Sequence, residues 1–172
     1  MLKNFDIQVP FIDGFYVFTL IINNKTEFTF EIPLGSWSIE DYKKQWCDGL
    51  SHLKMDESTC IVYDYLKVKK LEWPCVQQLD VFKKDNKLQI QRRIFLSDEY
   101  INMLKEKEYN AQSCYEFIKP IEMYNHNGWE LLVWSCNYDP KEIDLIIANI
   151  SGQKSKALKL MCKRIKKKKL KH

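Results

Sequence analysis

The sequence predicts an α+β fold: a mainly antiparallel β-sheet with helices packed on it, plus a basic amphipathic helix at the C-terminus. Three observations lead to this prediction. Short β-branched and aromatic runs are separated by turn residues in the first 95 residues. Two later segments repeat apolar residues at helical spacing. The chain has 172 residues, of which 45% are hydrophobic, and this is enough to bury one core without disulfides or metal.

The strand pattern dominates the first half of the chain. Residues 15–22 and 27–32 flank Asn23-Asn24-Lys25 and predict a hairpin, because asparagine tolerates the left-handed backbone of a short turn. Three further strands are predicted at residues 59–66, 71–82 and 88–95, with a turn over residues 83–87. Pro74 has no backbone N–H, so we expect it at a sheet edge or a bulge.

A helix is predicted over residues 38–53. Ser38 is a good N-cap, and Asp41 stands three residues later, where its side chain can complete a capping box. Trp37 and Tyr42 have the spacing of a hydrophobic staple. The apolar face continues at helical spacing and has charged residues opposite it, so we expect this helix to pack on the sheet.

The second half is less regular. A short helix is predicted to begin at residues 97–99, and residues 114–118 are ambiguous between helix and strand. Residues 125–128 (NHNG) form a strong turn signal before a strand at 129–134. Asp139-Pro140 then predicts a helix start, and Ser151-Gly152 predicts its end or a bend.

The helix segment also carries a family resemblance. Residues 37–50 (WSIEDYKKQWCDGL) resemble the segment that marks the immunity proteins of bacterial contact-dependent growth inhibition systems. Weaker matches follow in the same order along the chain, so that the resemblance spans about residues 15–140. These are Trp73-Pro74, residues 85–95, residues 115–120 with Glu122, Asn127-Gly128 and Trp134.

The chain departs from that family pattern at three places. Residues 131–133 (LLV) replace a more polar run, and Asn86 stands where glycine is expected in a turn. The chain beyond about Asn149 has no counterpart in the pattern. These differences concern the partner and the tail more than the fold.

The resemblance implies a function in binding. It implies a cytoplasmic antidote that binds the toxic C-terminal domain of a large secreted effector, commonly a nuclease, and blocks its active site. The cognate toxin domain is then the expected partner. Residues 56–64 depart freely from the family pattern, and we expect Asp56, Glu57 and Asp64 to be acidic contacts to a basic toxin.

No feature of the sequence predicts an enzyme, and we expect no catalytic residues, no cofactor and no metal site. His52 and His126 have no catalytic motif around them, and no Gly-rich phosphate loop is present. The six cysteines lack a Cys-x-x-Cys spacing, so no zinc site is expected, and without an export signal we expect reduced thiols rather than disulfides. Four carboxylates match no liganding loop and are expected on solvated surfaces; they are Asp64, Asp80, Asp98 and Glu99.

Charge divides the chain into a domain at residues 1–150 and a lysine-rich tail at residues 151–172. The tail holds ten of the 27 basic residues and no acid, which leaves residues 1–150 with 17 basic and 23 acidic side chains. The tail predicts a basic amphipathic helix. It can dock on the acidic body, bind nucleic acid through phosphates, touch an anionic membrane surface, or stay disordered.

The alternative function therefore rests on the tail: a nucleic-acid-associated protein that acts through the lysine-rich helix. Against it, the body is acidic and no aromatic-basic alternation marks a base-stacking sheet. The chain has no apolar run long enough to span a membrane and no signal peptide pattern, so we expect a cytoplasmic protein. The sequence does not predict an oligomeric state.

Overall fold

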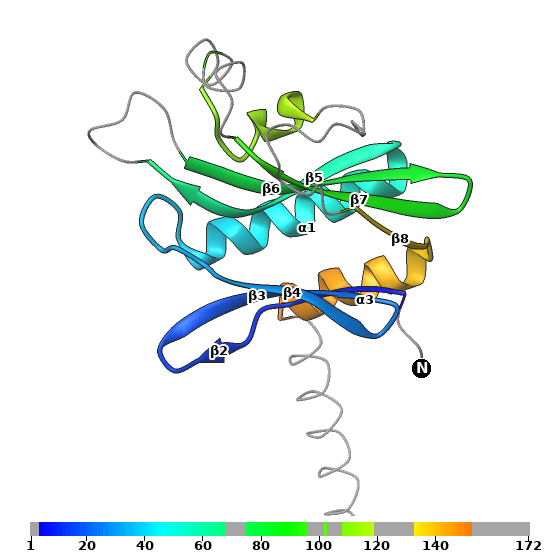
Figure 1. The fold of residues 1–172 in the computed structure, drawn as a ribbon, viewed down its shortest axis with the longest axis horizontal. Coiled ribbons are helices and arrows are strands. Elements are labelled where there is room, and N and C mark those ends of the chain that lie inside the picture. The colour runs from blue at the N-terminus through cyan, green and yellow to red at the C-terminus, as the bar shows by residue number, and fades with distance from the viewer. Residues whose placement is uncertain (1–3, 68–74, 96–101, 103–107, 119–132, 153–172) are drawn as a thin grey trace, which may run out of the picture.

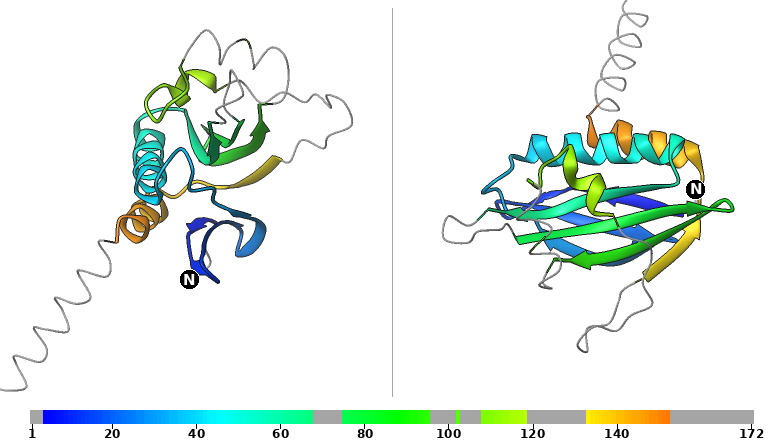
Figure 2. Two further views of the ribbon diagram at one scale, coloured as in Figure 1. Left: turned by 90° about the vertical axis from the view of Figure 1, so that its left-hand side faces the viewer. Right: turned by 90° about the horizontal axis from the view of Figure 1, so that it is seen from above.

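Two antiparallel sheets face each other, and two helices close one side of the space between them (Figures 1 and 2). The computed structural model describes residues 4–67, 75–95, 102, 108–118 and 133–152. Within these residues the predicted α+β class is confirmed. The predicted strand at 129–134 lies partly outside them. Pro74, the predicted helix start at 97–99 and the tail beyond Gly152 lie wholly outside them.

The first sheet is built around β3 (Phe15–Ile22). Strand β4 (Lys25–Glu31) pairs with one side of β3, while β1 (Phe5–Gln8) and the short β2 (Phe11–Ile12) pair with the other side. The predicted hairpin between β3 and β4 is confirmed. Asn23 and Asn24 have φ values of 50° and 64°, the left-handed conformation that asparagine tolerates best after glycine.

The second sheet has the order β5-β6-β7-β8. These strands are β5 (Ser58–Leu66), β6 (Cys75–Lys84), β7 (Lys87–Ile94) and β8 (Val133–Asn137). The turn between β6 and β7 is tighter than predicted, because only Asp85 and Asn86 lie between the strands, with φ values of 50° and 60°. Asn86 thus adopts the left-handed conformation for which the family pattern has glycine.

Two α-helices pack along the open side of the sheets. Helix α1 (Ile39–Met55) contacts β5, and α3 (Pro140–Ile150) contacts both α1 and β1. The predicted capping box of α1 is confirmed: Ser38 Oγ accepts from the Asp41 N–H, and Asp41 accepts from the Ser38 N–H at 2.8 Å. The staple is confirmed by the ring centroids of Trp37 and Tyr42, which lie 5.1 Å apart.

The start of α3 also follows the sequence prediction. Asp139 caps the helix by accepting from the Lys141 N–H at 2.9 Å, and Pro140 is the first helical residue. Ser151 ends the helix, and Gly152 follows with a φ of 71°. The ambiguous segment before β8 forms a single 3-10 turn, η1 (Ser113–Phe117).

Aromatic side chains join the two sheets and α1 into one core. The Phe18 ring of β3 lies 5.4 Å from the rings of both Trp46 on α1 and Tyr63 on β5. All three side chains are fully buried. Because such rings bury large apolar areas and pack with defined geometry, this cluster fixes how the sheets sit against each other. Among the described residues no helix is both long and apolar enough to cross a membrane.

Candidate functional site

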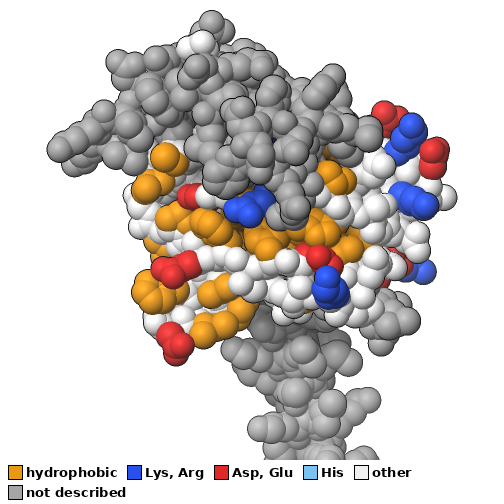
Figure 3. All heavy atoms as spheres, viewed as in Figure 1, with side chains coloured by type: hydrophobic (Ala, Val, Ile, Leu, Met, Phe, Trp, Pro, Cys, Tyr) orange, Lys and Arg blue, Asp and Glu red, His pale blue; other side chains and the backbone are white. Residues whose placement is uncertain are grey.

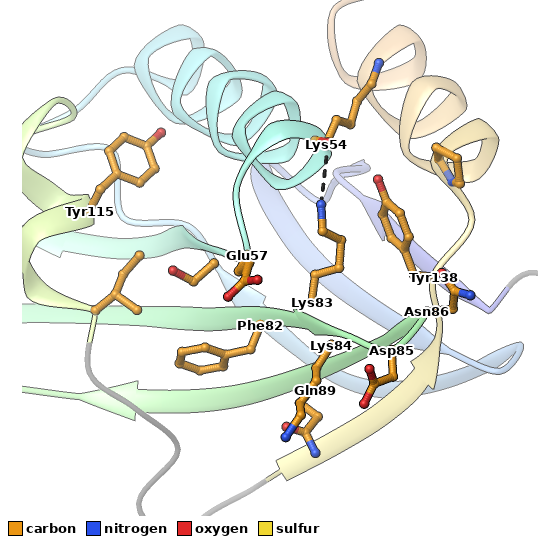
Figure 4. A pocket seen from close by; sticks show the side chains of 13 residues that line it. Lys54, Glu57, Phe82, Lys83, Lys84, Asp85, Asn86, Gln89, Tyr115 and Tyr138 are labelled. Carbon is orange, nitrogen blue, oxygen red and sulfur yellow. Dashed lines mark hydrogen bonds between the residues drawn. The ribbon is translucent and has the colours of Figure 1, made fainter.

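A hollow of about 1230 Å³ lies where the β6–β7 hairpin, the end of α1, η1 and the start of α3 meet (Figure 4). Its walls include Phe82 and Lys83 from β6, Tyr115 from η1 and Tyr138 just before α3. Glu57 stands on its rim between α1 and β5. A protruding side chain of a partner could enter this hollow.

Lys83 fixes the end of α1 against this hollow. Its Nζ donates to the backbone oxygen of Leu53 at 2.8 Å and to that of Lys54 at 3.5 Å, and Figure 4 marks the bond to Lys54. A cation at a helix C-terminus satisfies free carbonyl groups and opposes the helix dipole. The same Nζ lies 5.3 Å from the centroid of the Tyr138 ring. Lys83 therefore has a structural role at the hollow.

The opposite wall is held by contacts between α1 and α3. Lys54 Nζ lies 2.5 Å from Asp144 Oδ1, and both side chains are partly exposed. The backbone N–H of Tyr138 donates to Asn86 O at 2.8 Å, which ties the β6–β7 turn to the start of α3. Among the described residues no three His, Cys, Asp or Glu side chains gather as a metal site.

The predicted contact residues Asp56 and Glu57 lie together between α1 and β5. Both side chains are exposed. Asp56 ends α1, and its N–H donates to His52 O at 2.7 Å. The backbone oxygen of Glu57 accepts from the Lys83 N–H at 2.7 Å, so the β6 strand fixes its position. Of the two, Glu57 lines the hollow.

Asp64 lies near the other end of β5, roughly 23 Å from Glu57 at 3.3 Å per residue. The structure therefore does not bring the three predicted contacts into one patch. Asp64 is half-buried and accepts from Gln77 Nε2 at 2.7 Å. Burial raises its pKa, and the Gln77 hydrogen bond opposes that change.

Arg92 lies near Asp64, since both side chains hydrogen-bond to Gln77. Arg92 donates to the Tyr63 hydroxyl at 2.8 Å and to Gln77 Oε1 at 2.9 Å, and its guanidinium lies 5.6 Å from the centroid of the Phe28 ring. Burial is the main cause that raises the pKa of Tyr63 to about 12. Sequence reasoning missed this cluster, because its members come from four strands and no spacing along the chain connects them.

One expectation about the carboxylates was wrong. Asp80 was expected on a solvated surface, but it is fully buried and lies 2.5 Å from Arg93 Nε. Gln78 Nε2 donates to the same carboxylate at 2.6 Å, and the Tyr109 hydroxyl donates to Gln78 Oε1 at 2.6 Å. Buried charges need such partners. Asp98 and Glu99 lie outside the described residues.

The cysteines of the described part are all free thiols. Cys60 and Cys114 are fully buried beside each other, and Gln45 Nε2 lies 3.7 Å from the Cys114 sulfur. Burial raises the pKa of Cys60 well above its usual value, which makes its thiolate scarce and its reactivity low. These thiols belong to the core rather than to a reactive site.

Comparison with known proteins gives two matches. A model of the family described as the CdiI N-terminal domain matches residues 32–142. The fold is similar to that of a solved structure described as "CdiA-CT/CdiI toxin and immunity complex from Enterobacter cloacae", with a TM-score of 0.60 and 16% identity. This similarity covers 88% of this chain and 99% of that chain. No curated protein matches.

At 16% identity the similarity to the solved structure shows the fold alone. The family match covers most of the fold. It begins directly after β4 and continues through α1, the second sheet and the first turn of α3. It includes the segment at residues 37–50 that resembled the growth-inhibition immunity proteins. Since the matched residues make up more than half of the sequence, the chain belongs to the CdiI N-terminal domain family.

Proposed function

We propose that this protein is an immunity protein that binds the toxic C-terminal domain of a cognate growth-inhibition effector. The family membership of residues 32–142 carries the proposal, and the fold shared with a protein described as part of a toxin and immunity complex supports it. The activity of such a protein is binding, so it needs a shaped surface and no catalytic residues. We further propose that the toxin is a nuclease and that binding covers its active site.

The charge of the body fits this partner. Residues 1–150 hold 17 basic and 23 acidic side chains, a net charge of −6. Nucleases that grip RNA or DNA need basic surfaces to neutralise phosphates. Complementary charge of this kind accelerates encounter and disfavours wrong partners, while a few buried side chains set the dissociation rate.

We propose that Asp56, Glu57 and Asp64 are acidic contacts to the toxin, at two separate sites. Asp56 and Glu57 would act at the rim of the hollow, whereas Asp64 would act at the far end of β5. A globular toxin domain would have to cover most of that side of the protein to reach both sites. Each site therefore needs its own test.

The function is tested by a pull-down with tagged full-length protein from its native host, washed at low and then at high salt. We expect one polypeptide to be retained through the high-salt wash and to match the C-terminal part of a neighbouring secreted protein. Treatment of the lysate with nuclease before capture is the control. Loss of every polypeptide at low salt would contradict the proposal.

A second candidate function rests on the tail, where ten basic residues occur within residues 151–172. If the protein acts on nucleic acid, the pull-down recovers nucleic acid that the salt wash removes, because phosphate contacts weaken with salt. Removal of residues 151–172 should then abolish that binding and leave toxin neutralisation largely intact. A loss of protection on removal of the tail would contradict the placement of the toxin interface on the body.

A further inference from the structure

Exposed apolar side chains gather at the end of the molecule opposite the hollow. The described residues include eight large hydrophobic side chains that are exposed, and five of them lie here. We call these five the apolar end: Phe11, Ile12, Phe15, Leu34 and Leu66. Figure 3 shows hydrophobic side chains at this left-hand end, with acidic side chains among them.

The β2–β3 hairpin supplies three of the five residues. Its turn is Asp13-Gly14, with φ values of 49° and 92°, and Ile12 pairs with Phe15 across it. The Phe11 side chain is 63% exposed and that of Phe15 is 52% exposed. Because neighbouring residues of a strand point to opposite faces, this hairpin tip is apolar on both faces. Only one of these two faces can pack on the protein's own core.

Leu34 and Leu66 extend the surface from the hairpin. The backbone N–H of Ile32 donates to Tyr16 O at 2.9 Å, which holds the β4–α1 connection beside the hairpin. Within that connection, a Cβ on Gly35 would lie 3.0 Å from a methyl group of Leu66. The five side chains therefore come from three segments, and the β4–α1 connection lies against both the hairpin and Leu66. Clusters of this kind on a soluble protein mark interaction sites.

Among the described residues, the charged groups around the apolar end are three carboxylates and two lysines. Asp13 in the hairpin turn and Glu31 at the end of β4 are exposed, and Asp64 lies beside Leu66 in β5. Two lysines are also near: Lys43, whose Nζ lies 5.6 Å from the Tyr16 ring centroid, and Lys67, which follows Leu66. A partner that buries this end would thus meet apolar groups bordered by three carboxylates and two lysines.

We infer that the apolar end is the anchor of the interface with the toxin domain, and this inference rests on the proposed function. The contact surface that fits it is an apolar cleft with a basic rim on the partner. A twofold contact between two copies of this chain fits worse, because it would place the same carboxylates near each other. Aromatic anchors surrounded by polar groups are the common composition of binding hot spots.

The test measures the affinity of full-length protein for the purified C-terminal toxin domain. The double variant Phe11→Ala with Phe15→Ala should raise the dissociation constant at least roughly 30-fold, mainly through faster dissociation, as expected for two hot-spot aromatics. The matched control is Val133→Ala with Leu145→Ala, which truncates two exposed side chains away from this end. The control should change the dissociation constant by less than about twofold. Both variants should keep the melting temperature of the wild type, since all four side chains are exposed.

Each other outcome overturns a specific claim. If the wild-type protein does not bind the toxin domain, the proposed function fails. If the wild type binds and the double variant binds equally well, the toxin anchors elsewhere and the inference about the apolar end fails. In that case light scattering tests one other occupant. A dimer that dissociates in the double variant identifies a second copy of this chain as the occupant of the apolar end.

Discussion

The side-chain oxygen of Gln45 accepts a 3.0 Å hydrogen bond from the backbone N–H of Val62. The same amide donates through Nε2 to Cys60 O at 2.9 Å, and Trp46 Nε1 donates to Val62 O at 2.6 Å. β5 is an edge strand of its sheet, with β6 on its other side. An edge strand exposes unpaired backbone groups that invite aggregation. Helix α1 thus covers this edge with side-chain hydrogen bonds.

Truncation of Gln45 tests this covering. Gln45→Ala removes both hydrogen bonds and leaves the backbone groups of Cys60 and Val62 buried without them. We expect the free energy of unfolding to fall by about 3 kcal/mol, because two buried polar groups lose their partners. Urea denaturation followed by tryptophan fluorescence measures the change. Lys44→Ala, at the exposed neighbouring position, is the control and should change the stability by less than about 0.5 kcal/mol.

The approach of α1 to β5 requires glycine at position 49. A Cβ on Gly49 would lie 2.7 Å from Cys60 O, a backbone atom that cannot move away cheaply. Gly49→Ala gains about 1 kcal/mol in helix propensity, but the overpacking costs about 1–3 kcal/mol. We expect a net loss of stability in thermal unfolding. A melting temperature above that of the wild type would mean that α1 is not tightly seated on β5.

The pKa of Asp64 makes a prediction about stability and pH. Burial raises its pKa in the folded protein above the unfolded value of 3.8. The folded state therefore binds more protons than the unfolded state between these two pKa values, and stability falls as the pH rises through that window. Asp64→Asn should be more stable than the wild type at pH 7, and this gain should vanish as the pH falls below about 4. Urea denaturation at a series of pH values measures it, and an equal gain at all pH values would contradict the assignment to ionisation.

The two groups of predicted contacts can be separated by charge reversal. Asp56→Lys with Glu57→Lys changes the rim of the hollow, and Asp64→Lys changes the far end of β5. Each should slow association with a basic toxin domain if its site faces the toxin, and the effect should shrink at high salt because exposed charges are screened. Stopped-flow association kinetics at two salt concentrations measures this. A site whose reversal leaves the association rate unchanged is not in the interface.

Most of the described fold could be predicted from the sequence. Local signals fixed the start of α1 at Ser38, the start of α3 at Asp139 and the β3–β4 turn at Asn23-Asn24, because caps and turns depend on neighbouring residues. β1 and β2 were not predicted. The signal for β2 was present, since Asp13-Gly14 stands between two apolar pairs and is a strong hairpin pattern.

The candidate surfaces could not be predicted in the same way. Asp64 and Glu57 lie only seven residues apart, but an extended strand carries them to different ends of the molecule. The apolar end collects residues from three separate segments, and hydrophobic residues in a strand pattern are normally assigned to the core. Their exposure depends on the long-range packing of the hairpin and of the β4–α1 connection.

The most direct test of the central claim is growth protection. The toxic C-terminal domain of the neighbouring secreted protein is expressed in a sensitive bacterium, with or without this protein. We predict that growth is restored when the two are expressed together and that the purified proteins form a stable complex at high salt. Toxicity that is undiminished by abundant, folded protein would contradict the assignment as an immunity protein for that toxin.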